Sequence, residues 1–450
     1  MIQIKIKNKI ELHDAPEHVK RVLRKTLSLS NPLYFKMLRM GNHRALYATP
    51  EFFKYYTEHD DVMYIGRGME DRLIAYLDKN NIAYTYDNQI QCPTAKGPGV
   101  GTLKLRDYQR GDIAVIKRNT HGIIRLGTGY GKTVIATELI RHLATTALII
   151  VPRTHLLQQF VDTFKQYYGY EVGILQAQRT DKREITVTTF QTLIKRPEFV
   201  KEHWKSFGCL IVDECHTAVT KKRLQVIQSF APSYLYGLTA TARRTDEQGE
   251  ALHFTFGPII IDKEMEQHTP HVEILKTEMA IPVREYPDMV YDQINNPIRN
   301  QLIVQAILKE VLDSRRVLVL TKRIEHYERL HELLTLKNPL LVMHAISSGT
   351  GQRERIQLLS DLREGKSDFD VLLGTYSMLA TGTDIPSLDT LVFAGDLKSD
   401  VLAQQAVGRI LRLFKDKQSP KIIDVADFGN GIFLHQFKER RRFYKSQGWV

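Results

Sequence analysis

The sequence has few cysteines and no long apolar segment. Only three cysteines occur in 450 residues, Cys92, Cys209 and Cys215, which excludes a disulfide-stapled scaffold and matches no zinc-binding spacing. So few cysteines are typical of a reducing compartment such as the cytoplasm. No stretch approaches the ~20 consecutive apolar residues of a membrane-spanning helix, so we expect no membrane insertion. The first residues alternate apolar and polar side chains, which predicts a strand and not a signal peptide.

Acidic residues are fewer than basic ones. Lys and Arg number 63 and Asp and Glu number 51, which gives a formal net charge of +12. An excess of this size is typical of proteins that bind polyanions, although many basic proteins bind none. Residues 408–450 carry ten basic and four acidic residues, whereas residues 1–101 carry 15 and 11. The charge therefore gathers at the C-terminal end, where aromatic residues interleave with Arg440, Arg441 and Arg442. That segment could grip a nucleic-acid backbone or form a solvated basic helix.

Proline and glycine concentrate at residues 92–101, which predicts a boundary between domains. The module before it mixes a strand and an amphipathic helix with two runs, 34–36 and 52–56, that combine aromatic and basic residues. These aromatic side chains either belong to a core or stack on nucleobases. After the boundary, helical patterns alternate with continuous apolar runs, which are typical of strands buried on both faces of a parallel sheet. The runs are 147–151, 209–212, 317–320, 371–373 and 391–393.

A glycine-rich turn follows a predicted strand at 123–126 and precedes a predicted helix. It reads Gly-Thr-Gly-Tyr-Gly-Lys-Thr at 127–133. Backbone N–H groups in such a turn point at phosphate oxygens, and the helix N-terminus favours negative charge. Lys132 would contact the β- and γ-phosphates, and the Thr133 hydroxyl would ligate Mg²⁺. The strict pattern places glycine where Leu126 stands, so the match is incomplete. The turn residues Gly127, Thr128, Gly129, Tyr130 and Gly131 complete the predicted ATP site.

Two acids follow a second apolar strand. Asp213 and Glu214 come after residues 209–212. The carboxyl ends of parallel strands meet at one edge of a sheet, so these carboxylates are expected beside the phosphate loop. Asp213 would hold Mg²⁺, and Glu214 would orient the attacking water as a general base. The flanking carboxylates disfavour a reactive thiolate at Cys215. We expect His216 to link the acids to the next strand by hydrogen bonds.

The motifs resemble those of superfamily 2 helicases and translocases with a DEAH-type box, which here reads Asp-Glu-Cys-His. The resemblance covers residues 103–412 and is greatest to the branch-migration helicases of tailed phages. It rests on motif segments that follow one another in the family's order. Besides the phosphate loop and the acidic box, these are 105–109, the strand-contacting motifs 151–158 and 187–191, the coupling motif 237–241, and 318–323, 374–384 and 405–412.

The resemblance implies a fold and a set of further site residues. The fold is α/β, with two tandem RecA-like parallel-sheet domains at 103–267 and 268–450 and a small α+β accessory domain at 1–95. Gln109, with Arg106, would read adenine, Gly382 and Asp384 would touch the nucleotide, and Gln405, Arg409 and Arg412 would form the arginine-finger motif. The Arg pair shares a helix face and would stabilise charge on the leaving phosphoryl group. Backbone contacts to nucleic acid are expected from Arg153, Thr188, Gln191, Lys322, Arg323 and Thr375.

We therefore expect an ATP- and Mg²⁺-dependent DNA helicase or translocase that remodels forks and junctions. It would act as a monomer that contacts the DNA backbone without reading sequence, in the host cytoplasm if phage-encoded. The interval 384–400 leaves hardly any room for a strand-splitting hairpin, which favours branch remodelling over processive unwinding. Two alternatives remain: an RNA helicase acting on structured RNA, and a binding module whose affinity ATP switches without unwinding. A restriction-type motor is disfavoured because no nuclease motif occurs in the 450 residues.

Overall fold

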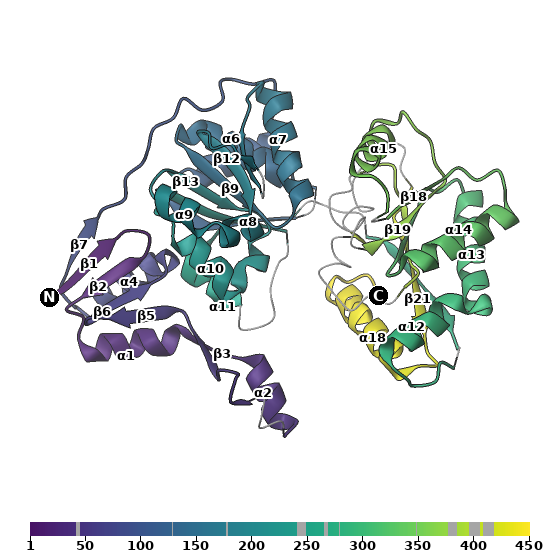
Figure 1. Cartoon of the computed structure of the whole chain (residues 1–450), viewed down its shortest axis with the longest axis horizontal. Coiled ribbons are helices and arrows are strands. Elements are labelled where there is room, and N and C mark those ends of the chain that lie inside the picture. Colours follow the sequence, from purple (N-terminus) through teal and green to yellow (C-terminus); the bar gives the residue numbers. More distant parts are fainter. Residues whose placement is uncertain are drawn as a thin grey trace. The chain divides into compact units, whose positions relative to one another are not determined.

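A computed structural model describes most of the chain, in two compact units, Met1–Glu264 and Met265–Val450 (Figure 1). The described residues are 1–41, 46–127, 129–176, 179–240, 249–264, 269–278, 280–347, 349–376, 385–395, 406–407 and 418–450, with only the backbone at 155, 352, 353 and 356. No helix within these ranges is long and apolar enough to cross a membrane.

The first unit opens with a five-stranded sheet in the order β5-β6-β2-β1-β7, in which only the β1–β7 pair is parallel. Apolar residues alternate along β1, so that Ile2, Ile4 and Ile6 are buried on one face. The core beneath this face also takes in α1 and α4. The elements are β1 (Ile2–Ile6), β2 (Ile10–His13), α1 (Glu17–Thr26), β5 (Tyr56–His59), β6 (Val62–Ile65), the 3₁₀ helix η1 (Arg67–Met69), α4 (Glu70–Lys79) and β7 (Tyr84–Asn88).

An arm projects from this module between α1 and β5 (Figure 1). It consists of β3 (Ser28–Ser30), α2 (Pro32–Arg39) and β4 (Phe52–Lys54), and β3 pairs with β4 in a separate two-stranded sheet. No residue of α2 is buried. The arm therefore reaches the core of the module only through Leu29 of β3, and α2 stands outside it.

The rest of the first unit is an eight-stranded sheet in the order β11-β10-β12-β9-β13-β14-β8-β15. All its pairs are parallel except β10–β11. Its strands are β8 (His121–Leu126), β9 (Ala147–Val151), β10 (Gly173–Gln176), β11 (Arg179–Thr180), β12 (Ile185–Thr189), β13 (Cys209–Val212), β14 (Tyr234–Thr239) and β15 (Ile259–Lys263). The helices are α5 (Asp107–Ile116), α6 (Lys132–Leu143), α7 (Thr154–Tyr168), α8 (Phe190–Lys195), α9 (Pro197–His203), the 3₁₀ helix η2 (Cys215–Val219), α10 (Lys221–Gln228) and α11 (Glu250–Phe256).

The second unit holds a six-stranded sheet in the order β16-β21-β20-β17-β19-β18, and every pair is parallel. Its elements are β16 (His271–Thr277), α12 (Tyr286–Asn295), α13 (Pro297–Leu312), β17 (Val317–Thr321), α14 (Ile324–Lys337), β18 (Met343–Ile346), α15 (Gln352–Glu364), β19 (Val371–Thr375), β20 (Thr390–Phe393), β21 (Lys421–Asp427) and α18 (Gly431–Ser446). The two parallel sheets and the α+β module confirm the predicted fold class.

The N-terminal module is seated on the first parallel-sheet domain through α11. Phe254 of α11 is 2% exposed and belongs to the hydrophobic core of the module. At Gly68 a Cβ atom would overlap the backbone of His253 and Gly257. The guanidinium of Arg67 is buried and donates to the carbonyl of Pro232. This contact leaves no room for a side chain at its centre, so the two parts pack as one body.

The proline- and glycine-rich connection also lies against the first parallel-sheet domain. Thr94 forms an isolated bridge with Thr145, and the amide of Thr102 donates to the Tyr167 carbonyl at 2.8 Å. Both ends of the connection are therefore fixed by backbone hydrogen bonds.

We predict that Gly68→Ala lowers the free energy of unfolding by about 1–3 kcal/mol, because the added methyl group must displace backbone atoms of α11. The measurement is thermal unfolding of the full chain. Gly111→Ala is the matched control: Gly111 lies in α5 with open space around its Cα, and alanine there should stabilise the chain by about 0.4–1 kcal/mol. Equal melting temperatures for the two variants would contradict the tight seating.

Candidate active site

The phosphate loop connects β8 to α6 in the strand–turn–helix order predicted from the sequence. Gly131 stands at the N-cap of α6 with φ of +93°, a conformation that favours glycine. A Cβ atom there would also lie 2.7 Å from Nε2 of Gln109. Both the backbone conformation and the neighbouring amide thus require glycine before Lys132.

Gln109 anchors this loop to α5. Its Nε2 donates to the Tyr130 carbonyl at 3.0 Å, and its Oε1 accepts from the Arg106 amide at 3.0 Å. A carboxamide can donate twice and accept twice, so these bonds leave capacity for the adenine contact that the resemblance implies. Arg106 is exposed, and its Nη1 donates to the Tyr108 hydroxyl at 2.8 Å.

A hydrogen bond between Tyr130 and Asp112, which the sequence did not predict, is a second contact that holds the loop against α5. The Tyr130 hydroxyl donates to Oδ2 of Asp112 at 2.5 Å, and its ring packs 4.6 Å from that of Tyr108. Burial raises the pKa of Tyr130, and the bond to Asp112 acts in the same direction. The signal available in the sequence is spacing: Asp112 lies three residues after Gln109, on the face of α5 that buries Ile113.

The acidic pair lies where β13 ends, beside the phosphate loop. Nζ of Lys132 lies 3.2 Å from Oε1 of Glu214, and both side chains are largely buried. Burial raises the pKa of Asp213, and the neighbouring Glu214 carboxylate acts in the same direction. Burial opposes ionisation of Glu214 too, but Lys132 and His216 outweigh it and lower the pKa of Glu214. Glu214 is therefore held as an ion pair with Lys132.

His216 connects Glu214 to the next strand. Its Nδ1 lies 3.1 Å from the Thr239 hydroxyl at the end of β14 and 3.3 Å from Oε2 of Glu214. Burial raises the pKa of the Cys215 thiol, with Glu214 and Asp213 acting in the same direction, so a thiolate is disfavoured there. The contacts join the acidic box to the coupling motif.

The oxygen atoms needed for Mg²⁺ lie on this same edge. Thr133 lies in the first turn of α6, where its hydroxyl accepts from Nε2 of Gln159 at 3.3 Å. Asp213 supplies a carboxylate. Hydroxyl and carboxylate oxygens suit Mg²⁺, which usually takes few protein ligands and completes its shell with water and nucleotide phosphates. Within the described residues no group of three His, Cys, Asp or Glu could hold a metal alone, so the residues present fit an ion that binds with the nucleotide.

The residues of the first domain that were predicted to contact nucleic acid differ in exposure. Arg153 and Gln191 are exposed, at the N-cap of α7 and in α8. Thr188 is fully buried within β12, and its hydroxyl donates to the Leu175 carbonyl at 3.0 Å. The prediction of a phosphate contact by Thr188 is wrong, because its side chain is fully buried and its hydroxyl is already bonded within the protein.

In the second unit, Lys322 and Arg323 are exposed where β17 ends. Nζ of Lys322 donates to the Tyr286 hydroxyl at 2.6 Å and lies 4.6 Å from the centroid of its ring. Thr375 is 7% exposed at the end of β19. Thr128, Gly382, Asp384, Gln405, Arg409 and Arg412 lie outside the described residues.

The basic and aromatic C-terminal segment is α18, and it packs against its own domain. Arg440 is 3% exposed and binds both carboxylate oxygens of Asp424, and Tyr444 donates to the same carboxylate at 2.7 Å. Phe437 and Phe443 are also buried. This arrangement corrects the idea that the whole segment grips a nucleic-acid backbone, because its aromatic face and Arg440 are used inside the protein.

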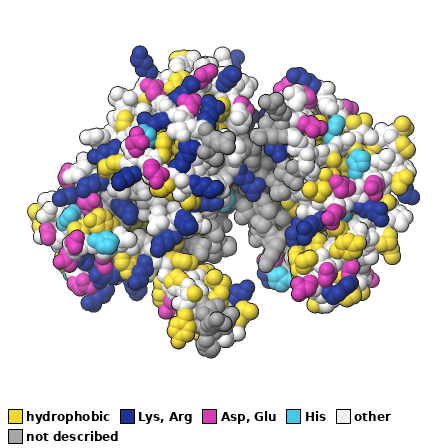
Figure 2. All heavy atoms as spheres, in the orientation of Figure 1, with side chains coloured by type: hydrophobic (Ala, Val, Ile, Leu, Met, Phe, Trp, Pro, Cys, Tyr) yellow, Lys and Arg dark blue, Asp and Glu magenta, His cyan; other side chains and the backbone are white. Residues whose placement is uncertain are grey.

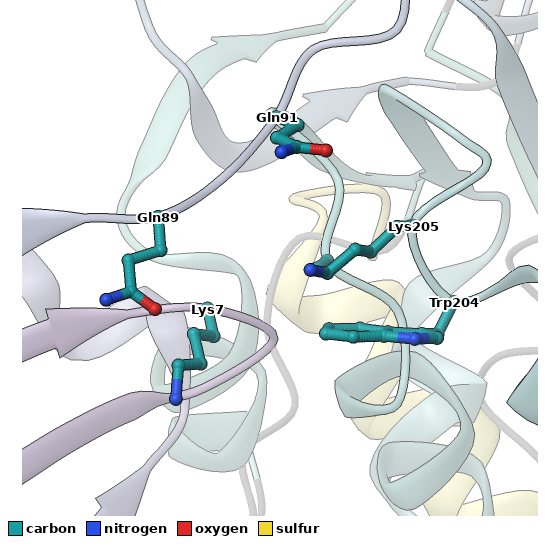
Figure 3. Close-up of a pocket in the computed structure, with 6 residues that line it drawn as sticks. Lys7, Gln89, Gln91, Trp204 and Lys205 are labelled. Carbon is teal, nitrogen blue, oxygen red and sulfur yellow. The ribbon is translucent and has the colours of Figure 1, made fainter.

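A hollow of about 260 Å³ lies elsewhere in the first unit (Figure 3). Lys7 and Gln89 approach it from the N-terminal module, and Trp204 and Lys205 approach it from the segment before β13. The Lys205 ammonium lies 4.5 Å from the centroid of a Trp204 ring. Asp213 follows the other end of β13, and no phosphate-loop residue lines the hollow. The hollow is therefore distinct from the nucleotide site.

Two family models match the chain. "Type III restriction enzyme, res subunit" matches residues 102–244, which include the phosphate loop and the acidic box, and "Helicase conserved C-terminal domain" matches residues 299–414. The two matched segments follow one another in the order expected from the motifs. The chain belongs to helicase superfamily 2. This helicase is accordingly a nucleic-acid-dependent ATPase.

Three relatives illustrate the family around this helicase. A protein of Invertebrate iridescent virus 6 named as a helicase (161L) is 29% identical over 382 residues, covering 79% of this chain and 84% of the relative. A protein of Acanthamoeba polyphaga mimivirus named as an ATP-dependent RNA helicase (L396) is 24% identical over 91% of this chain and 79% of the relative. The ATP-dependent DNA helicase uvsW of Enterobacteria phage T4 is 24% identical over 71% of this chain and 68% of the relative.

We predict that Glu214→Gln preserves ATP binding but lowers turnover by about 10²–10⁴-fold, because the amide cannot act as a general base. Lys132→Ala should weaken ATP binding as well, since the cation facing the phosphates is removed. The measurements are nucleotide affinity and steady-state ATPase rate with a saturating nucleic acid. Glu202→Gln, at a side chain that is 75% exposed, is the control. Normal turnover by Glu214→Gln would refute the general-base role.

We predict that Arg440→Ala lowers the free energy of unfolding by about 3–5 kcal/mol, because Asp424 is left charged and buried without its partner. Arg441→Ala is the matched control, since Arg441 is exposed in the same helix, and its effect should stay within about 0.5 kcal/mol. Urea unfolding followed by circular dichroism measures both. Equal losses for the two variants would show that Arg440 is not a core residue.

Proposed function

We propose that this helicase uses ATP hydrolysis to move along DNA and to remodel branched DNA, such as replication forks and recombination junctions. One observation carries the proposal: the accessory module is packed on α11, the first helix described after the coupling motif at Thr239. A module fixed to the motor domain can hold one arm of a branch while the motor moves along another. The resemblance to phage branch-migration helicases and the short interval 384–400 support the same activity.

The geometry of the nucleotide site is compatible with a change in the ion-pair partner of Lys132 when ATP binds. Lys132 is paired with Glu214 in the structure. ATP would bring phosphates to the loop, and Lys132 would turn to them because they carry the larger negative charge. Glu214 would then be released to orient the attacking water and to accept its proton at a carboxylate oxygen. The Mg²⁺ ion held with the nucleotide by Thr133 and Asp213 would offset phosphate charge.

The coupling of hydrolysis to movement is assigned to the path through His216. Its imidazole touches both Glu214 and Thr239. A change in the partner of Glu214 therefore alters a hydrogen bond to the coupling motif at the end of β14. We assign His216 a positioning role in this path, because it lies between the reacting carboxylate and the motif.

Two other functions stay as alternatives. The mimivirus relative is named for RNA and aligns with most of the chain, which favours the RNA helicase. A binding module whose affinity ATP switches would use the same site without directional movement. The name of the T4 relative and the resemblance of the motifs favour DNA, and we retain DNA as the proposed substrate.

We predict that a four-way DNA junction stimulates ATP turnover more strongly than single-stranded DNA, blunt duplex or structured RNA. All four are compared at equal nucleotide concentration and at one fixed salt concentration, because backbone binding depends steeply on salt. Junction-selective stimulation should persist in Arg441→Ala. The strongest stimulation by RNA would overturn the choice of substrate and leave the ATPase assignment in place. ATP turnover without displacement of any labelled strand would favour the binding module whose affinity ATP switches.

A further inference from the structure

The arm formed by β3, α2 and β4 exposes an unusual number of large apolar side chains. Leu33, Leu38, Met40, Tyr47 and Phe52 are between 44% and 96% exposed. Figure 2 shows apolar side chains gathered on this projecting lobe. Contiguous exposed apolar surface is costly in water and usually marks a binding site.

Hydrogen bonds of the Asn31 side chain hold the two ends of the arm together. Asn31 is 3% exposed; its side chain donates to the Pro50 carbonyl at 2.7 Å and accepts from the Leu33 amide at 3.1 Å. At the base, the Tyr55 amide donates to the carbonyl of Leu27, which is a core residue. The arm therefore continues the hydrogen bonding of the module, and its apolar side chains are held outward.

The structure also separates the aromatic residues that the sequence grouped together. Tyr55 and Tyr56 pack against the core of the module, whereas Phe52 is 44% exposed on the arm. A hollow of about 590 Å³ beside Phe53 is lined by Leu33, Pro50 and other mainly apolar residues. The aromatic residues of the base thus have a structural role, and those of the arm are available to a ligand.

The charge of the arm indicates the chemistry of that ligand. Residues 28–54 contain four basic residues and one acidic residue. Lys36, Arg39 and Lys54 are exposed beside the apolar side chains, and in the described part of the chain none of them forms an ion pair. Apolar and aromatic side chains next to unpaired cations fit bases that are unstacked and flanked by phosphates. Such bases occur where strands separate at a branch point.

We propose that this arm is a wedge that binds nucleic acid at a branch point. Its apolar side chains pack against unstacked bases, and Lys36 and Arg39 contact the flanking phosphates. The inference rests on the proposed function, since it supplies the contact by which the module would recognise a branch. It adds a site to the nucleic-acid surface of the motor domains.

The test uses the full chain without nucleotide, at fixed salt. The probes are a DNA fork with 2-aminopurine at the branch, the same fork in RNA, and a blunt DNA duplex with 2-aminopurine at its centre. The double variant Leu38→Ser/Met40→Ser removes exposed apolar surface, and Lys36→Gln/Arg39→Gln removes charge. Leu336→Ser/Leu340→Ser is the matched control, because these residues are 79% and 89% exposed in the second unit.

We expect the wild type to raise the fluorescence of the branch base. The Leu38→Ser/Met40→Ser variant should bind the fork about tenfold more weakly without this rise, and should bind blunt duplex within twofold of wild type. The Lys36→Gln/Arg39→Gln variant should show a smaller salt dependence of fork binding, by up to about two phosphate contacts. The control variant should match the wild type.

Three results would overturn the wedge: a wild type that leaves the branch base stacked, a Leu38→Ser/Met40→Ser variant that still opens it, or a wild-type dimer that this variant disperses in sedimentation. The last would assign the apolar surface to a second copy of the chain. Failure of the proposed function looks different: the branch base opens through the arm, but ATP drives no movement of the branch. Opening of the RNA fork alone would retain the wedge and remove DNA as the substrate.

Discussion

Parallel pairing of strands is the constraint on which the rest of this helicase depends. Because β8, β13 and β14 run in the same direction, their carboxyl ends lie at one edge of the sheet. Lys132, Glu214 and Thr239 are more than a hundred residues apart in sequence at their extremes, yet each lies at or just beyond that edge. The ion pair of Lys132 with Glu214, and the contact of His216 with Thr239, follow from this geometry. Tight packing of β-branched and aliphatic side chains holds the strands, and the chemistry is confined to their ends.

Much of this arrangement could be predicted from the sequence because its signals are local. A strand, a glycine-rich turn and a helix occupy adjacent residues, so the position of Lys132 follows from backbone preferences alone. The same holds for the apolar run that ends in Asp213. Two such motifs then fix their mutual position through the rule that parallel strands end at one edge. The anchor formed by Gln109 and Asp112 is less visible, because polar residues on a buried helix face carry no mark of their partner.

Other features depend on contacts between distant residues, and the sequence carries little sign of them. Thr188 lies in a motif of strand contacts, but its side chain is fully buried and its hydroxyl donates to the Leu175 carbonyl. Arg440 stands in a run of three arginines that look alike, and only its spacing from Tyr444 in α18 and the place of Asp424 on β21 make it a core residue. The sequence shows that three arginines are charged, but which of them is buried depends on how α18 is rotated about its axis as it packs on the sheet.

The position of Phe254 has a consequence for how the chain is made. This side chain completes the core of the N-terminal module, yet it is synthesised more than 160 residues after β7 ends at Asn88. At about 5–20 residues per second, a ribosome needs roughly 8–30 s to cover that distance. During that time the module has left the exit tunnel without Phe254 in its apolar core, and the surface around Gly68 that α11 will cover is exposed. Its final packing must therefore await α11, which makes the first unit fold as a whole and gives nascent chains a period in which chaperones can bind.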